Sequence, residues 1–185
     1  MRAIALILGL VLNLMLYAGA GEFGGLDGLQ TFILLSLLNF VAILFHELGH
    51  AWAFRYVGGT VQRIVVMFLS YNVNRRRLGF YRGRSGGDVG GFVDGRYRPE
   101  GPTVRDKIIV AGAGPFANAV TGGLALLLAE LFGGAFQLGD TALVLFGVLS
   151  IGLGLLNLLP YGGSDGQLIV RALRMRAAMG GKRRG

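Results

Sequence analysis

The sequence of 185 residues has no cysteine, only two histidines and few charged side chains. The lack of cysteine excludes disulfide bonds, thiol chemistry and cysteine ligands for a metal. Charged residues make up 15% of the chain, whereas about 25% is usual in a soluble domain. This shortage of charge, together with 53% hydrophobic residues, indicates a membrane protein.

The charge that is present is mainly positive, with a net value of +8. A nucleic-acid-binding domain is the obvious alternative for a basic chain. The arginines, however, flank long apolar runs and form no separate polar domain. We therefore expect a lipid bilayer around the protein and no nucleic-acid partner.

Four apolar runs are close to or above the roughly 20 residues that a helix needs to cross a bilayer. They cover residues 3–20, 31–57, 108–132 and 141–160. The first run could also be a cleaved signal peptide, because Arg2 precedes it and Ala18, Gly19 and Ala20 resemble a cleavage site. We predict an α-helical integral membrane protein with about four transmembrane helices.

The positions of lysine and arginine predict the orientation of these spans. All 18 lie at Arg2, Arg55 and Arg63, between residues 75 and 107, or after residue 170. The connections 20–30 and 133–140 contain none. Because basic residues stay on the cytoplasmic side, we expect a multi-pass protein of a prokaryotic cell membrane with both termini in the cytoplasm.

The segment between the second and third runs differs in composition from the runs themselves. Residues 61–71 are rich in β-branched and aromatic side chains, and residues 79–93 combine aromatics with glycines. This pattern predicts two to four short strands. We expect a small β-element at the cytoplasmic membrane surface, within residues 59–100.

The two histidines occur in the pattern His46-Glu47-Leu48-Gly49-His50. On a helix, residues four apart share a face, so both imidazoles can bind one metal ion with Glu47 beside it. Polar residues that only pack inside a helix bundle are the alternative. Ionisable side chains within an apolar run are costly and usually functional, so we predict a zinc site here.

A catalytic zinc needs a third protein ligand, and with no other histidine or cysteine this ligand must be a carboxylate. Asp165 is the best candidate, because it follows the fourth apolar run after Pro160 and two glycines. Proline ends a helix and glycine permits a sharp turn. The chain can therefore bring Asp165 back to the metal.

Three motifs in this order resemble the site-2 protease family of intramembrane zinc metalloproteases, peptidase family M50. They are His46–His50, the stretch Gly114-Pro115-Phe116-Ala117-Asn118, and Asn157 with Pro160, Asp165 and Gly166. Residues 89–93 are similar to the glycine turn of the family's β-element. The chain differs at residues 111–115, which read AGAGP where a single AGP is usual. It also lacks PDZ and CBS domains, so we expect a minimal form.

The resemblance implies a zinc metalloendopeptidase that hydrolyses peptide bonds within or near transmembrane segments of membrane proteins. The role would be regulated intramembrane proteolysis or clearance of membrane peptides. The resemblance implies one Zn2+ per chain, held by His46, His50 and Asp165, with Glu47 as the catalytic base.

The same resemblance places Asn157 and Asn118 in the substrate cleft. A buried asparagine can instead fasten two neighbouring helices, and this alternative stays open for both. A strand edge at Gly91, Phe92 and Val93 would pair with the backbone of an unwound transmembrane substrate.

We divide the chain into three parts. Residues 1–30 hold the first helix and an outer loop, residues 31–166 the catalytic transmembrane core, and residues 167–185 a basic amphipathic C-terminal segment. Residues 165–179 have the pattern of an amphipathic helix.

Two other functions are open from the sequence. One is a non-proteolytic membrane scaffold or assembly partner that retains the protease fold, and the other is a metal transporter. A scaffold needs no base, so Glu47 counts against the first. Three converging ligands and four spans provide little for a transport path, which counts against the second.

Overall fold

The computed structural model of the chain describes residues 2–81, 90–132 and 137–181. Within these residues the chain forms five helices and a four-stranded sheet. The helices are α1 (Arg2–Gly24), α2 (Gly28–Tyr56), α3 (Val104–Phe132), α4 (Gln137–Leu158) and α5 (Asp165–Gly181). The strands are β1 (Thr60–Val66), β2 (Leu69–Asn72), β3 (Arg77–Phe80) and β4 (Gly91–Arg96).

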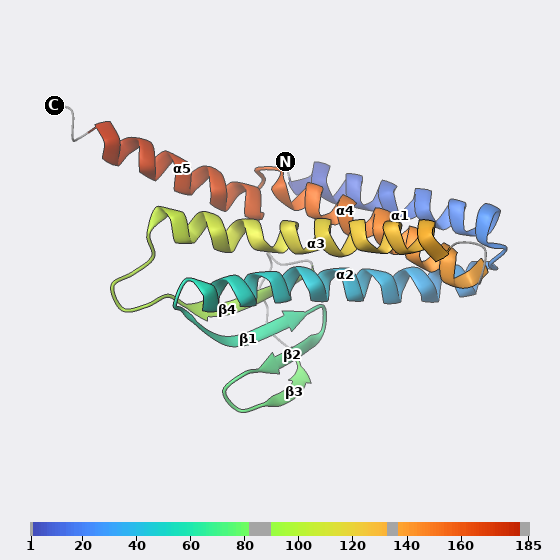
Figure 1. The fold of residues 1–185 in the computed structure, drawn as a ribbon, viewed down its shortest axis with the longest axis horizontal. Coiled ribbons are helices and arrows are strands. Elements are labelled where there is room, and N and C mark those ends of the chain that lie inside the picture. The colour runs from blue at the N-terminus through green and yellow to red at the C-terminus, as the bar shows by residue number, and fades with distance from the viewer. Residues whose placement is uncertain (1, 82–89, 133–136, 182–185) are drawn as a thin grey trace.

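Helices α1 to α4 run side by side along the long axis of the molecule (Figure 1). Among the described residues, three helical stretches are long and apolar enough to cross a membrane, namely Gly28–Tyr56, Val104–Phe132 and Gly139–Leu158. In α1 the apolar stretch Ile7–Gly21 is shorter. The structure confirms a mostly helical chain with three helices of membrane-spanning length, and the fourth span stays a prediction.

The outer faces of these helices carry large apolar side chains. Leu29 and Phe32 of α2 are 69% and 65% exposed, and Leu131 of α3 is 64% exposed. Polar side chains such as Thr31, Asn118 and Ser150 are buried instead. This distribution is expected when lipid rather than water surrounds the helices.

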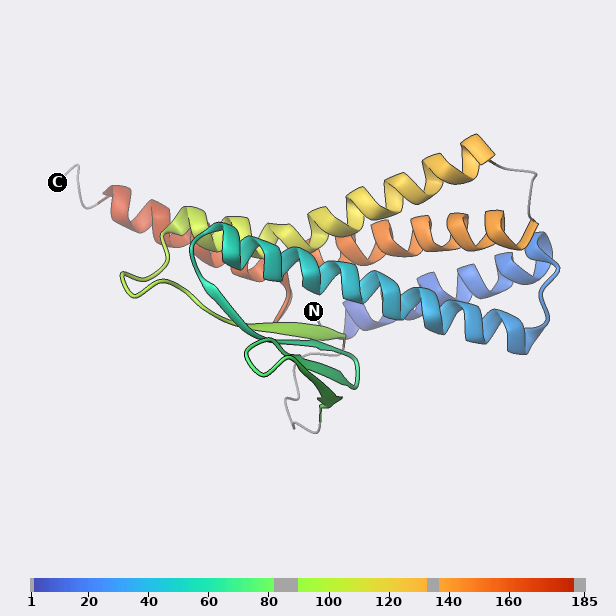
Figure 2. The same cartoon turned by 60° about the horizontal axis from the view of Figure 1, so that its bottom comes forward.

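The sheet lies between α2 and α3 in the sequence, as predicted, and packs beside α2 (Figure 2). All neighbouring strands are antiparallel, in the order β3-β2-β1-β4. A buried cluster that includes Phe54 of α2, Val57 directly after α2, Val61 of β1 and Val110 of α3 joins the sheet to both helices. The predicted β-element also includes residues 82–89, which lie outside the described residues.

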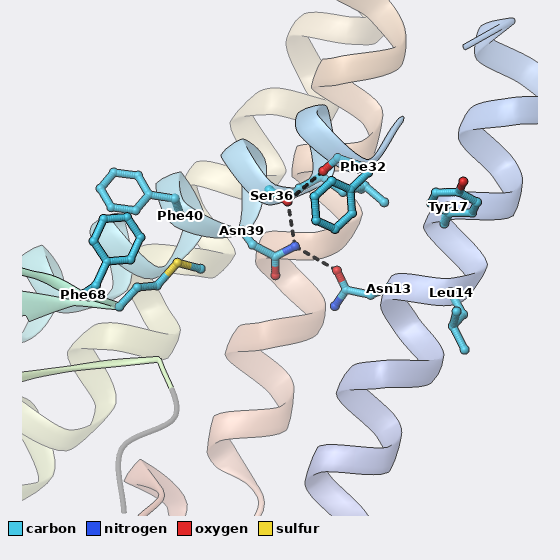
Figure 3. Close-up of a pocket in the computed structure, with 10 residues that line it drawn as sticks. Asn13, Leu14, Tyr17, Phe32, Ser36, Asn39, Phe40 and Phe68 are labelled. Atoms are coloured by element: carbon cyan, nitrogen blue, oxygen red, sulfur yellow. Dashed lines mark hydrogen bonds between the residues drawn. The ribbon is translucent and has the colours of Figure 1, made fainter. Parts of the chain in front are cut away.

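The sheet lies beside earlier turns of α2 as well as beside the last turn of that helix. Met67 and Phe68, at the turn between β1 and β2, line a cavity of about 570 Å³ with Asn13, Asn39 and Phe40 (Figure 3). In that cavity Asn39 donates a hydrogen bond of 2.8 Å to the side-chain oxygen of Asn13. A polar link of this kind fastens α1 to α2 within otherwise apolar surroundings.

Helix α5 follows α4 after a short turn and extends away from the bundle (Figure 1). Its bounds, Asp165–Gly181, confirm the helix predicted for residues 165–179. Residues 182–185 of the predicted C-terminal segment lie outside the described residues.

Candidate metal centre

Helix α2 supplies three neighbouring polar side chains to the interior of the molecule. His46, Glu47 and His50 are 6%, 5% and 9% exposed. The helix begins at a capping box, in which Asp27 accepts a hydrogen bond from the Gln30 backbone and the Gln30 side chain accepts from Asp27 N–H. The capped start stabilises one continuous helix, and the four-residue spacing then directs both imidazoles to the same side.

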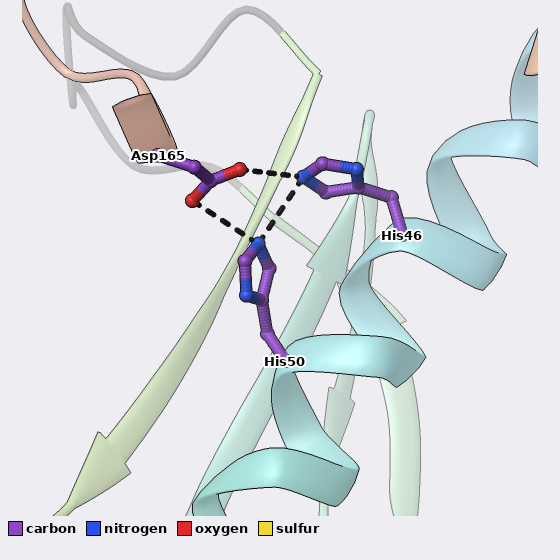
Figure 4. A group of neighbouring side chains, drawn as sticks. All are labelled: His46, His50 and Asp165. Carbon is purple, nitrogen blue, oxygen red and sulfur yellow. Dashed lines mark hydrogen bonds and ion pairs between the residues drawn. The ribbon is translucent and has the colours of Figure 1, made fainter. Parts of the chain in front are cut away.

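The turn between α4 and α5 brings Asp165 to these histidines. Gly163 has a φ of 92°, a conformation that favours glycine. Ser164 is buried and accepts a hydrogen bond of 3.2 Å from Gln167 N–H, so it caps the start of α5. Asp165 is therefore fixed in the first turn of α5, and its side chain points at His46 and His50 (Figure 4).

The donor atoms lie about as far apart as the ligands of one tetrahedral zinc ion. His46 Nε2 lies 3.0 Å from an oxygen of Asp165 and 3.1 Å from His50 Nε2. His50 Nε2 lies 3.3 Å from the other Asp165 oxygen. Ligands about 2.05 Å from a tetrahedral zinc are about 3.3 Å apart. These three residues form a buried group that could hold a metal ion.

A backbone carbonyl of α3 orients one histidine for metal binding. Nδ1 of His50 lies 2.7 Å from the carbonyl oxygen of Val110. A carbonyl can only accept, so Nδ1 carries the proton and Nε2 keeps its lone pair for a metal.

The other histidine contacts a side chain of the same helix. Asn118 is 1% exposed, and its amide nitrogen lies 3.3 Å from Nδ1 of His46. Its backbone carbonyl accepts a hydrogen bond of 3.0 Å from the hydroxyl of Ser150 in α4. Asn118 thus occupies the interface of α2, α3 and α4.

Gly114 of α3 leaves room for the two donor nitrogens. A Cβ atom at this position would lie 2.6 Å from His46 Nε2 and would also collide with His50 Nε2. Only a glycine allows α3 to approach both imidazoles this closely. Glycine at this position therefore keeps the two donor nitrogens free of a colliding side chain.

Glu47 lies against the backbone of strand β4. A Cβ atom on Gly91 would come within 2.9 Å of Glu47 Oε1 and 2.6 Å of the Val65 carbonyl oxygen. The absence of a side chain at Gly91 therefore lets the Glu47 carboxylate lie against the backbone of β4.

Two groups after α4 have shifted pKa values. Burial raises the pKa of the Asp165 carboxyl group, but the hydrogen bonds with His46 and His50 outweigh it and hold this pKa below its usual range. Burial and the Asp165 charge raise the pKa of the Tyr161 hydroxyl. Tyr161 therefore stays protonated and donates a hydrogen bond of 3.3 Å to the side chain of Asn157.

The structure brings four of the nine predicted site residues into one group of contacting side chains. His46, His50 and Asp165 contact one another, and Asn118 contacts His46. Phe92 and Val93 lie farther along β4, and Asn157 lies near the end of α4.

Val110 was not predicted as a site residue, and Gly114 was named only within the motif of residues 114–118, without a role beside the histidines. These residues and Asn118 are spaced four apart in α3, as His46 and His50 are in α2. That matching period was the available signal, because it predicts one face of α3 turned toward the histidines.

Apolar helices of membrane-spanning length around a buried His–His–Asp group place the chain among helical membrane proteins with an internal group that could hold a metal ion. Residues 32–141 match the family model of peptidase family M50, and the chain belongs to that family. No curated protein and no solved structure gave a match. Membership implies an intramembrane metalloprotease function at the level of the family.

Proposed function

We propose that the chain is a zinc metalloendopeptidase of the site-2 protease type, which cleaves membrane proteins within or near their transmembrane segments. The observation that carries the proposal is the convergence of three donor atoms, two of them on α2, which is long enough to cross a bilayer, and the third at the start of α5. His46 lies ten residues before Tyr56, the last residue of α2, which is about 15 Å along the helix. The reaction would therefore take place below the membrane surface.

One zinc ion per chain would be held by Nε2 of His46, Nε2 of His50 and the carboxylate of Asp165. Three protein ligands leave a fourth position open, as a catalytic site requires. When bound, zinc supplies a Lewis acid that polarises the scissile carbonyl and makes water a better nucleophile at neutral pH. The Asp165 carboxylate supports this assignment because it brings negative charge to the histidines. Gly114 supports it because no side chain fills the space beside the two Nε2 atoms.

Glu47 would act as the base. It neighbours His46 on α2 and is buried against Gly91. The carboxylate would take a proton from the attacking water and deliver it to the amine that leaves when the peptide bond breaks. A carboxylate in this position performs both transfers without a second acidic residue.

Strand β4 would hold the substrate. Met67 N–H donates to the Gly90 carbonyl oxygen, 2.6 Å away, and the β1–β4 register then pairs Val66 with Gly91 and Val65 with Phe92. Hydrogen-bonded pairs alternate along an antiparallel ladder. The backbone groups of Phe92 therefore face β1, whereas those of Gly91 and Val93 face the other edge of β4.

That other edge has no neighbouring strand among the described residues. An unwound substrate has bare N–H and C=O groups, each of which costs several kcal/mol in a low-dielectric environment. Gly91 and Val93 would pair with these groups beside Glu47, without reading the substrate sequence. Asn157, which Tyr161 orients, would contact the substrate from α4.

For the whole chain we propose four spans, with α1 as the first. Both termini and the sheet would lie in the cytoplasm, because lysine and arginine gather in those segments. The substrate is then a transmembrane protein or peptide that reaches the site from within the bilayer.

The test is cleavage of single-span substrates by the purified chain in proteoliposomes. Products identified by mass spectrometry should end within or next to the substrate's transmembrane segment. Glu47→Gln should abolish cleavage, because it removes the base. Equal cleavage by the Glu47→Gln protein would show that this residue is not the base.

A further inference from the structure

Asn118 meets His46 on the ring nitrogen that faces away from Asp165. Its amide nitrogen lies 3.3 Å from Nδ1, while Nε2 of the same ring lies 3.0 Å from Asp165. Among the described residues, the Asn118 side-chain oxygen has no hydrogen-bond partner, although it is buried. A buried acceptor without a donor costs about 1–3 kcal/mol.

The two orientations of this amide have opposite consequences for His46. If the NH2 group faces the ring, Nδ1 must accept and the proton of the neutral imidazole is on Nε2, where no metal can bind. If the oxygen faces the ring, Nδ1 carries the proton and Nε2 offers its lone pair. A half-turn of the amide exchanges the two states without changing its shape.

We propose that Asn118 is a positioning residue for the metal, and that its amide oxygen accepts a hydrogen bond from Nδ1–H of His46. This inference rests on the zinc site of the proposed function. It gives the side-chain oxygen a donor, and it gives His46 the tautomer that the Val110 carbonyl imposes on His50. Both histidines are then set for the metal by one face of α3.

The backbone of Asn118 has a separate role, which makes the side chain testable. Its carbonyl oxygen accepts from Ser150 of α4 at 3.0 Å, and this contact does not involve the amide. Substitution of the side chain therefore leaves that α3–α4 hydrogen bond in place.

Leucine and aspartate have the branched shape and the number of side-chain heavy atoms of asparagine, and Asn118→Leu removes the acceptor whereas Asn118→Asp keeps one. We expect zinc affinity, measured by competition with a chelator, to fall about 10–100-fold in Asn118→Leu, the usual loss for a group that orients a ligand. Asn118→Asp keeps an oxygen beside Nδ1 and should bind zinc at least as tightly as the unsubstituted chain. Asn157→Leu is the matched control and should change zinc affinity less than about twofold, because its side chain bonds to Tyr161.

A second measurement reads the hydrogen bond itself. The chain has only two histidines, so ring-15N-labelled protein without a polyhistidine tag gives NMR signals from His46 and His50 alone. In the zinc-loaded protein, Asn118→Asp should shift the Nδ1–H signal of His46 and leave that of His50 in place. A substitution that merely loosened the packing of the helices would shift the Nδ1–H signals of both histidines.

The inference is overturned if Asn118→Leu binds zinc as tightly as the unsubstituted chain, or if Asn118→Asp binds it more weakly. It is also overturned if the His46 signal is unchanged in Asn118→Asp, which decides the matter even when Asn118→Leu does not fold. Failure of the proposed function looks different, because the unsubstituted chain would then bind no zinc or cleave nothing.

Discussion

At the scale of single residues, the metal site depends on two residues of α3 that lie against the imidazoles without being ligands themselves. The Val110 carbonyl oxygen is 2.7 Å from Nδ1 of His50, and it determines which ring nitrogen is free. Gly114 contributes by having no side chain, since a Cβ atom there would lie 2.6 Å from His46 Nε2. Metal affinity should therefore be sensitive to residues that are not ligands.

Gly114→Ala tests this sensitivity. The added methyl group would occupy the space between the imidazoles, so one of them must move. We expect zinc affinity to fall roughly 10–100-fold, as for other losses of ligand orientation, in a chelator competition assay on folded protein.

Gly112→Ala is the control for that substitution. It lies in the same helix, and a Cβ atom at Gly112 meets no described atom within 4 Å outside the helix's own backbone. Alanine favours a helix over glycine by about 1 kcal/mol, so folding should be unchanged or slightly improved. Equal zinc binding by the two variants would contradict the role given to Gly114.

At the scale of elements, α3 and the sheet pack against the His46–His50 motif of α2 and complete the site. Val110, Gly114 and Asn118 repeat every four residues and face the equally spaced His46 and His50 across the α2–α3 interface. On the other side of α2, strand β4 brings Gly91 against Glu47. The site is thus formed between one helix and one strand edge.

Successive N–H groups of β4 face opposite edges of the strand. Proline should therefore have different effects at two neighbouring positions. Val93→Pro removes an N–H that faces the free edge, and we expect cleavage to fall about five- to tenfold, the equivalent of one hydrogen bond near 1 kcal/mol, with zinc content unchanged. Phe92→Pro removes an N–H that faces β1 and should lower the thermal stability of the protein. Unchanged cleavage by a stable Val93→Pro protein would refute substrate pairing at this edge.

Sequence reasoning succeeded where a motif follows the period of its element. The spacing of His46 and His50 predicted a shared helix face, and Pro160 with its glycines predicted the turn that returns Asp165. The clearance at Gly114 and the acceptor at Val110 depend on how two helices approach each other. The distance between the two helices cannot be read from one sequence, because many side chains together determine it.

At the scale of the whole molecule, the proposed function requires one definite orientation of the chain in the membrane. Three helices have spanning length, and the polar link between Asn13 and Asn39 attaches α1 to α2 within the apolar region. Along the sequence, basic segments alternate with connections that contain no lysine or arginine from one apolar run to the next. This distribution should determine the orientation in the cell.

Single cysteines test that orientation directly, because the chain has none of its own. A cysteine at Gly25, which is exposed in the connection between α1 and α2, should react with an impermeant thiol reagent outside intact cells. A cysteine at the exposed Glu100, between β4 and α3, should react only after the cells are opened. The reverse pattern would contradict the proposed topology.

The central claim is that one chain holds a hydrolytic zinc with His46, His50 and Asp165 and uses Glu47 as its base. The most direct test is zinc content measured on the same proteoliposome preparations that are assayed for cleavage. The unsubstituted chain and Glu47→Gln should each bind about one zinc per chain, and only the former should cleave. Asp165→Ala should lose zinc and activity together, because it removes a ligand. Full zinc content and normal cleavage in Asp165→Ala would contradict the account.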